Sequence, residues 1–227
     1  MSLHLTVIAK EPRPGFVKSR LCPPCTPGEA ADIAAAALLD TLDAIDRVIE
    51  RSRVGGLDVT PVLLFDGETA GWVRPGYEVV AQRGDDLATR LANAFDDLGP
   101  GLVVGMEVPS AIPHLTAALP TLRSGADVLG LAVDGGYWAI GLHRADPAVF
   151  RDVPMSTSVT GLVQLSRLHA LRRSVRLLPM VHDLDTIADL RIAATDRPGA
   201  DIAARLPDLA RRVLARVDGA VVTRLGG

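Results

Sequence analysis

The sequence predicts an α/β protein, a single three-layer α/β/α domain with a mainly parallel, mixed sheet. Short apolar runs bounded by turn residues alternate with amphipathic segments through most of the chain. This alternation is typical of a mainly parallel sheet that helices cover on both faces. Apolar residues make up 48% of the 227 residues, which is enough for one sizeable core. No repeat, low-complexity tract or linker is evident, so we expect residues 1–227 to form one domain.

The first strand is expected at residues 3–9, a mostly apolar run that stops before a loop rich in proline and glycine. Further strands are expected at residues 59–65, 77–81, 101–106, 126–132, 138–142 and 175–178. Helices are expected at residues 30–53, 84–98, 110–123, 156–171 and about 200–217, and another begins near residue 186. The apolar positions of these helices fall near helical spacing, which indicates that one face of each packs on the sheet.

Capping residues indicate where several helices begin. Thr26 with Glu29 forms a capping-box signature, and Thr186 with Asp189 forms a similar one. Ser110 is expected to cap the helix that follows it, and the pair 156–157, Ser and Thr, is expected to cap another.

Composition excludes several classes of function. The net charge of −3 and the isoelectric point near 5.9 do not favour nucleic acid or an anionic membrane as a partner. No apolar run is long enough for a membrane helix, and the first residues lack the pattern of a signal peptide. We therefore expect a cytoplasmic protein without a membrane span. Cys22 and Cys25 form a Cys-x-x-Cys pair that is either a redox dithiol or, more simply, two reduced thiols in a loop.

The loop after the first strand is cationic. It carries Lys10, Arg13, Lys18 and Arg20 around Gly15, and a helix follows soon after. A strand, a glycine-containing basic loop and a helix together present backbone N–H groups and positive side chains to phosphate. The loop matches neither a Walker A motif nor a GxGxxG fingerprint. The alternative interpretation is an ordinary solvated surface loop.

Acidic residues follow three later strands. Glu107 ends the strand at 101–106, Asp134 begins an Asp-Gly-Gly turn, and the pair Asp183 and Asp185 follows the last strand. If these carboxylates share one cleft, they suit Mg²⁺ or Mn²⁺ together with substrate phosphate and water. His182 is a further candidate ligand, although imidazole suits Mg²⁺ poorly. The alternative is a generic α/β domain whose acids are helix caps and turns.

Five stretches in order resemble the bacterial radical-SAM/selenodomain-associated transferases, a family of GT-A-like glycosyltransferases. They span about residues 3–191 and comprise VIAKEPRPGFVKSRL at the first loop, GDDLATRL at 84–91, VVGMEVP at 103–109, DGGYWAIGL at 134–142, and DLDT before ADL at 183–190. The segments KSRL and DLDT also resemble 2-phospholactate guanylyltransferases. The resemblance implies a GT-A or nucleotide-diphospho-sugar transferase-like fold.

The resemblance also implies roles for individual residues. Residues expected to bind the nucleotide are Lys10, Arg13, Gly15, Lys18, Arg20, Asp86 and Arg90. Glu107 and Asp185 are expected to hold Mg²⁺ or Mn²⁺. Asp134 is expected to act as the catalytic base or to orient the acceptor, and Gly135, Gly136 and Tyr137 are expected to contact that acceptor.

The sequence departs from the family pattern where Asp-Ser-Pro becomes Glu107-Val108-Pro109 and where Trp-Ser-Thr becomes Met155-Ser156-Thr157. Glutamate keeps the charge but is one methylene longer, and valine removes a hydroxyl. The leading hypothesis is a metal-dependent glycosyltransferase that uses a nucleotide-sugar donor and a small-molecule acceptor. A second is nucleotidyl transfer to a phosphorylated small molecule. A third, motivated by Glu107-Val108, is a degenerate protein that binds a nucleotide or a partner without catalysis.

Overall fold

The computed structural model describes residues 2–69, 71–195 and 205–225. Its strands are β1 Leu3–Lys10, β2 Val59–Asp66, β3 Glu78–Ala81, β4 Gly101–Gly105, β5 Asp127–Ala132, β6 Tyr137–Leu142 and β7 Val175–Val181. Its α-helices are α1 Pro27–Val54, α2 Leu87–Leu98, α3 Leu115–Arg123, α4 Thr160–Ala170, α5 Ile187–Thr195 and α6 Arg205–Leu225. Three short 3₁₀ helices in the described ranges are η1 Ser19–Leu21, η2 Pro109–His114 and η3 Pro147–Phe150.

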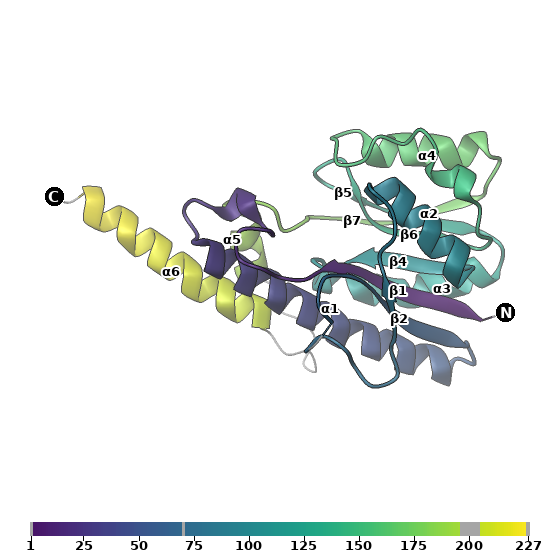
Figure 1. Cartoon of the computed structure of the whole chain (residues 1–227), viewed down its shortest axis with the longest axis horizontal. Helices are drawn as coiled ribbons and strands as arrows, with labels where there is room; N and C mark the ends of the chain where they lie inside the picture. Colours follow the sequence, from purple (N-terminus) through teal and green to yellow (C-terminus); the bar gives the residue numbers. More distant parts are fainter. Residues whose placement is uncertain (1, 70, 196–204, 226–227) are drawn as a thin grey trace.

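The strands form one sheet in the order β3-β2-β1-β4-β6-β5-β7 (Figure 1). Among the described strands, β6 is antiparallel to both of its neighbours and every other pairing is parallel. This confirms the mainly parallel, mixed sheet predicted from the alternation of strands and helices. The strand order reverses at β1, since β2 and β3 lie on one side of β1 and β4 lies on the other.

Helices cover both faces of the sheet, because most strands bury apolar side chains on each side. Leu5 and Val7 of β1 belong to the apolar cluster that α1, η2 and α3 share with the sheet. Ile8 packs against the opposite cluster, which contains Leu91 and Phe95 of α2 together with residues of η3 and α4. The three layers α/β/α follow directly from this alternation of side chains along the strands.

A third apolar cluster, smaller than the one that α1, η2 and α3 share with the sheet, joins the first half of α1 to α5 and α6. Leu21 from the loop after β1 and Leu184 from the loop after β7 are both buried in it. Ion pairs strengthen this junction, since Arg205 at the start of α6 bonds Asp40 and Asp43 of α1. These contacts bring together the two loops that carry the basic and acidic residues of interest.

The two cysteines lie at this junction. Both are free thiols, and Cys25 is buried within the smaller cluster. Burial, with a further contribution from Glu29, raises the pKa of the Cys25 thiol. A buried thiol with a raised pKa is a poor nucleophile, so the geometry favours the simpler interpretation of this pair.

The capping boxes predicted at Thr26 and Thr186 are confirmed. Each threonine accepts a hydrogen bond from a backbone N–H three residues later, from Glu29 and from Asp189 respectively, and each of these acids accepts one in return. The expected cap at Ser110 is wrong. A 3₁₀ helix occupies Pro109–His114, and α3 begins only after it, at Leu115.

Three further boundaries differ from those expected. The helix predicted from residue 156 begins at Thr160, because Ser156 has a left-handed backbone with φ of +59° and the chain turns there. The last strand continues through Pro179 to Val181, which the edge of a sheet allows, since an edge residue needs no donor on its outer side. The C-terminal helix runs to Leu225, and its expected start at residues 200–204 lies outside the described residues.

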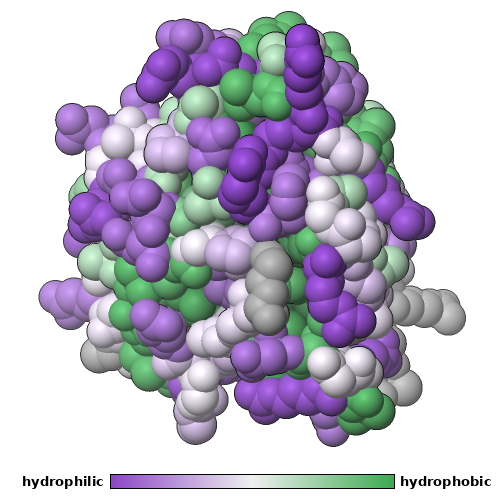
Figure 2. All heavy atoms as spheres, turned by 90° about the vertical axis from the view of Figure 1, so that its right-hand side faces the viewer, coloured by the Kyte–Doolittle hydropathy of each residue, from purple (hydrophilic) through white to green (hydrophobic). Residues whose placement is uncertain are grey.

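The surface is mixed in character on the side where β1 begins. Figure 2 shows this face, on which hydrophilic residues surround separate groups of hydrophobic ones. Within the described ranges, no helix combines the length and the apolar character needed to cross a bilayer. The parallel strands run away from this side, so their carboxyl ends lie at the other end of the sheet (Figure 1).

His4 is a buried titratable group within β1. It is 4% exposed, its Nδ1 lies 2.7 Å from Thr6 Oγ1, its Nε2 lies 3.1 Å from the Gly99 carbonyl oxygen, and its ring packs against Phe95. Burial lowers the pKa of His4 from 6.5 to about 4, although the bond to Gly99 opposes the effect. The folded protein therefore holds this histidine neutral.

We predict that His4 makes the fold sensitive to acid. Below pH 6.5 the unfolded chain takes up a proton that the folded chain refuses, so the free energy of unfolding falls by about 3 kcal/mol through this group between pH 7 and pH 4. Urea unfolding at both pH values checks this. The loss should be about 3 kcal/mol smaller in His4→Gln and unchanged in the control His114→Gln, whose side chain is exposed. Equal losses in all three proteins would contradict the assignment.

Candidate functional site

Basic and acidic residues meet at the point where the strand order of the sheet reverses. Lys18 and Arg20 lie in the segment after β1, and Glu107 directly follows β4, the strand next to β1. Asp183 and Asp185 follow β7 and reach the same place. In open α/β sheets, ligands bind outside the carboxyl ends of the strands at such a switch point.

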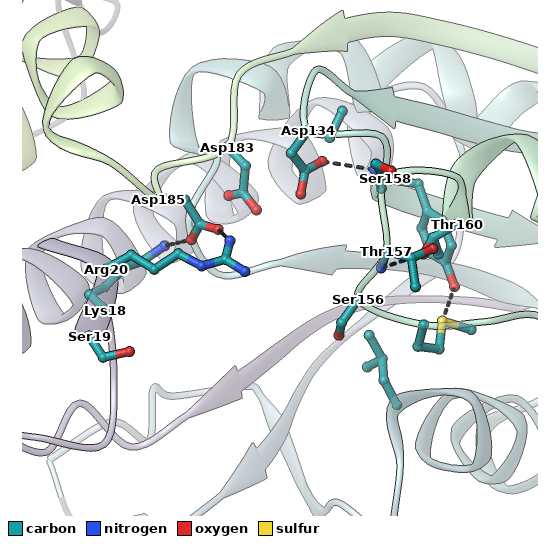
Figure 3. Close-up of a pocket in the computed structure, with 15 residues that line it drawn as sticks. Lys18, Ser19, Arg20, Asp134, Ser156, Thr157, Ser158, Thr160, Asp183 and Asp185 are labelled. Carbon is teal, nitrogen blue, oxygen red and sulfur yellow. Dashed lines mark hydrogen bonds and ion pairs between the residues drawn. The ribbon is translucent and has the colours of Figure 1, made fainter.

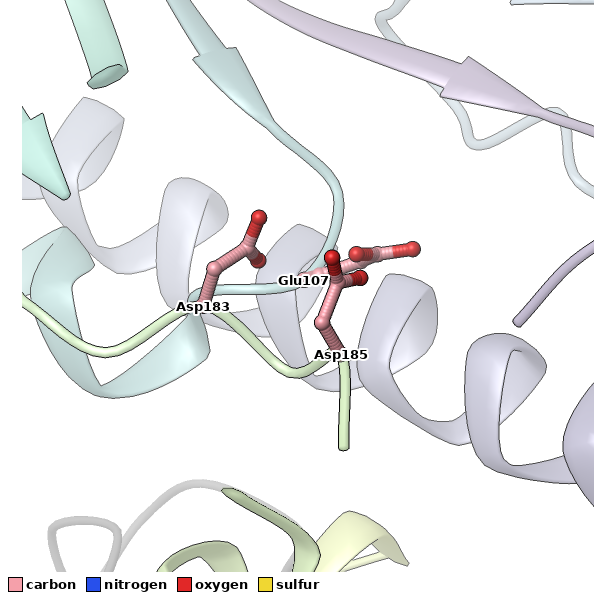
Figure 4. A group of neighbouring side chains, drawn as sticks. All are labelled: Glu107, Asp183 and Asp185. Atoms are coloured by element: carbon pink, nitrogen blue, oxygen red, sulfur yellow. The ribbon is translucent and has the colours of Figure 1, made fainter. Parts of the chain in front are cut away.

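Three carboxylates form the centre of the site. One oxygen each from Glu107, Asp183 and Asp185 lies within 4.8 Å of the others (Figure 4). We call these residues the acidic trio. The Lys18 ammonium lies against it, bonding the Glu107 carboxylate and the Leu184 carbonyl oxygen and lying 3.2 Å from Asp185 Oδ1. Arg20 donates to the second oxygen of Asp185 at 2.6 Å.

Burial dominates the electrostatics of these groups. It raises the pKa of Glu107 to about 7, against the opposing effect of Lys18. It also raises the pKa of Asp183, to which the charges of Asp185 and Asp134 add. Burial alone lowers the pKa of Lys18, but Glu107, Asp183 and Asp185 together outweigh it, so that the pKa lies above its ordinary value. The trio thus favours a bound cation, because uncompensated negative charge is costly there.

A cleft of two adjoining cavities opens beside the trio. The first has a volume of about 550 Å³ and the second of about 530 Å³. The two cavities adjoin, because both are lined by Leu87, Tyr137, Met155, Ser156 and Asp183. Figure 3 shows the first cavity with Lys18, Arg20 and Asp185 on one side and the hydroxyl residues 156–158 on the other.

The second cavity lies over β1 and the start of α2. Lys10, Asp86 and Arg90, three of the residues expected to bind the nucleotide, line it. Asp86 caps α2 by accepting from the backbone N–H of Thr89, so the helix-cap interpretation also holds for this residue. Arg90 bonds the Gly84 carbonyl oxygen and the Asp66 carboxylate.

The turn after β5 packs directly on the hydroxyl-rich segment. Asp134 lines the first cavity, and one of its oxygens accepts a hydrogen bond from the Gly136 N–H at 2.8 Å. Gly135 has a φ of +92°, and a Cβ there would lie 2.0 Å from the Ser158 carbonyl oxygen. The turn therefore needs glycine both for its backbone conformation and for its close approach to residue 158.

Most of the predicted site residues converge, but some do not. Arg13 is exposed, bonds Glu11 and stacks on the Phe16 ring, and neither it nor Gly15 is among the residues that line the two cavities. His182 is exposed and takes no part in the acidic trio. Gly136 and Tyr137 line the first cavity. Gly135 does not line it and instead packs against the backbone of Ser158.

Asp183 completes the trio, in agreement with the acidic residues expected to share a cleft, whereas the family resemblance implied only Glu107 and Asp185 as metal ligands. Sequence reasoning missed one feature of the site. Ser156, Thr157 and Ser158 form a wall of the first cavity, whereas the sequence predicts only a helix cap at the first two. The run of three hydroxyl residues ahead of the true helix start was the signal that could have identified this wall.

The donor set of the trio suits a hard divalent cation. Three carboxylates offer oxygen ligands from three separate side chains, and Mg²⁺ and Mn²⁺ prefer oxygen. Val108 does not weaken this fit, because the three carboxylates already lie within reach of one ion, while Val108 is buried in the main core and lines the second cavity. The longer side chain of Glu107 reaches the other two carboxylates.

Comparisons with known proteins agree with the fold. A model of a family described as "Uncharacterized protein conserved in bacteria (DUF2064)" matches residues 57–157. No curated protein matches the sequence. A proposed nucleotide-diphospho-sugar transferase from Desulfovibrio desulfuricans G20 is 24% identical, with 96% of this chain and 97% of that chain covered and a TM-score of 0.79.

Two other structures are more distant. The CMP:2-keto-3-deoxy-manno-octonic acid synthetase complexed with CTP is 12% identical, with 84% of this chain and 95% of that chain covered and a TM-score of 0.51. Rv0371c from Mycobacterium tuberculosis H37Rv in complex with manganese is 19% identical, with 84% and 97% covered and a TM-score of only 0.45. On the two stronger matches, the chain has a nucleotide-sugar transferase-like fold.

We predict that Gly135→Ala destabilises the protein and distorts the first cavity. The new Cβ would meet backbone, which cannot yield as a flexible side chain does, so the free energy of unfolding should fall by about 2 kcal/mol or more. Urea unfolding measures this loss. Gly76→Ala is the matched control, because Gly76 has a similar φ of +82° with nothing within 4 Å of the added carbon. Equal losses in both variants would show that backbone strain alone is responsible.

Proposed function

We propose that the chain is a metal-dependent, nucleotide-using transferase whose donor is a nucleotide sugar, and that it works as a single domain. The observation that carries this proposal is the acidic trio, which lies beside Lys18 and Arg20 at the wall of a 550 Å³ cavity. Carboxylates for a divalent ion and cations for phosphate are the two requirements of a departing diphosphate. Both lie at the switch point of a sheet with the fold of nucleotide-sugar transferases.

Each part of the cleft has a proposed role. Glu107, Asp183 and Asp185 would hold Mg²⁺ or Mn²⁺, which supplies positive charge against the diphosphate when bound. Lys10, Asp86 and Arg90 line the second cavity, where the nucleoside would bind. Lys18 and Arg20 would contact the diphosphate. The donor sugar and the acceptor would occupy the first cavity, between these cations and the hydroxyl wall of residues 156–158.

Asp134 is the proposed general base. It lines the first cavity, and the Gly136 N–H donates to only one of its two carboxylate oxygens, Oδ1. The acceptor hydroxyl would lose its proton to Asp134 as its oxygen bonds the sugar carbon, while the bond from that carbon to the diphosphate oxygen breaks and the nucleoside diphosphate leaves. Gly136 and Tyr137 would help position the acceptor.

Nucleotidyl transfer is the second candidate. The synthetase that shares the fold is complexed with CTP, and the same cations would serve a triphosphate. Attack would then occur at the α-phosphorus atom, and pyrophosphate would leave. The finding that Glu107 joins the trio removes much of the motive for a degenerate, non-catalytic protein.

Ligand-dependent thermal unfolding tests the proposal. We expect a panel of nucleoside diphosphate sugars to include one that raises the melting temperature with Mn²⁺ and not with EDTA, with about 2.7 kcal/mol of stabilisation at a hundredfold excess over Kd. A shift with a nucleoside triphosphate alone would favour nucleotidyl transfer. No shift with any nucleotide, with or without metal, would contradict both.

Substitution of a trio residue tests the role of the metal. We predict that Asp185→Asn lowers turnover with the identified donor about a hundredfold or more, since even residues that only support a metal ligand contribute 10- to 100-fold. Asp97→Asn is the matched control, because Asp97 lies in an exposed pair with Arg83 near the far end of α2 and should leave turnover unchanged. Equal turnover in Asp185→Asn and the unsubstituted protein would remove Asp185 from the metal site.

A further inference from the structure

Lys18 lies among the carboxylates that would hold a metal ion. Its side chain is 3% exposed, and its ammonium group contacts Glu107 Oε2 and Asp185 Oδ1. Arg20 holds the other oxygen of Asp185. Both oxygens of Asp185 and one of Glu107 are therefore already engaged by cationic side chains.

A divalent ion and this ammonium group compete for the same oxygens. Mg²⁺ lies about 2.1 Å from its ligands, so an ion shared by the trio would lie next to the Lys18 nitrogen at a distance where two positive charges repel. Lys18 comes from the segment after β1, Glu107 from the segment after β4 and Asp185 from the segment after β7. Only the Lys18 side chain therefore needs to move for a divalent ion to reach the carboxylates.

The presence of lysine, not arginine, at position 18 is consistent with a side chain that moves between two binding partners. The chain contains 24 lysines and arginines, of which only Lys10 and Lys18 are lysines; Lys10 is the last residue of β1 and Lys18 lies in the segment after it. Lysine is a compact point charge on a flexible stem, whereas arginine is a planar fork suited to fixed bidentate pairs. Lys18 also has a left-handed backbone, with φ of 51° and ψ of 36°, and such strain is characteristic of functional positions.

We propose that Lys18 is a tethered counter-ion that fills the acidic trio until a divalent cation displaces it. The displaced ammonium group then turns into the first cavity, which Lys18 lines, and binds the diphosphate of the donor. Metal binding and diphosphate binding are coupled through this one side chain, because the metal frees the cation that the diphosphate needs. This inference rests on the proposed metal-dependent function and adds a conformational step to it.

Amine acylation of the unsubstituted protein tests the displacement directly. The protein is treated briefly with N-hydroxysuccinimide acetate in EDTA or in Mn²⁺, and modification of each lysine is measured by mass spectrometry. Lys18 should be protected in EDTA and become labelled at least tenfold faster with Mn²⁺. Lys10 is an internal control, since it is exposed and should react at the same rate in both conditions. Unchanged protection of Lys18 at saturating Mn²⁺ would overturn the proposal.

Metal affinity gives a second test. Electron paramagnetic resonance of free Mn²⁺ should show that Lys18→Met binds Mn²⁺ at least tenfold more tightly than the unsubstituted protein, because a competing cation is gone. Arg13→Met is the matched control. It removes one positive charge from the same loop without touching the trio, and it should bind Mn²⁺ within about twofold of the unsubstituted protein.

The outcomes separate this inference from the proposed function. Equal Mn²⁺ affinity in Lys18→Met and the unsubstituted protein would overturn the counter-ion role and leave the metal site intact. Weaker binding by Lys18→Met would also overturn it, because Lys18 would then support the metal. If neither protein bound Mn²⁺, with unsubstituted protein still folded by circular dichroism, both the inference and the metal dependence of the proposed function would fail.

Discussion

The site depends on the balance of charge between three converging carboxylates and the lysine that lies among them. Carboxylate oxygens of Glu107, Asp183 and Asp185 approach within 4.8 Å in a partly buried place, where burial raises the pKa of both Glu107 and Asp183. Lys18 offsets this cost, and its buried ammonium group is in turn stabilised by the same carboxylates. A cluster that requires a cation in order to be stable is also a cluster that can exchange one cation for another.

The sheet supplies the geometry for this balance. Pairing of β1 with β4 places the segment containing Lys18 beside Glu107, and the strand order reverses between these two strands. The acids after β7 come from the far edge of the sheet, and they reach the centre because Leu184 is buried with Leu21 in the cluster that α5 and α6 cover. Helices α5 and α6 therefore support the site through packing. None of their described residues lines either cavity.

Glu107 and its neighbour Val108 illustrate how packing and chemistry separate. Glu107 and Val108 are neighbours in sequence, but one carboxylate joins the trio while the valine side chain fills the main core. The valine therefore need not be understood as a loss from the site. The glutamate side chain also brings its carboxylate to Lys18, which comes from the segment after β1, the strand paired with β4.

The sequence by itself determined the layered α/β fold, the order of its strands and helices along the chain, the capping boxes at Thr26 and Thr186, and the cationic and acidic loops, because these depend on local periodicity and on residue type. The tertiary structure alone decided which of those loops meet. It placed Lys18 inside the trio, joined Asp183 to Glu107 and Asp185, and left Arg13 and His182 outside. It also turned the chain at Ser156, so that residues 156–158 became a cavity wall in place of a cap. Such outcomes depend on strand order and on contacts between distant segments, which local patterns do not encode.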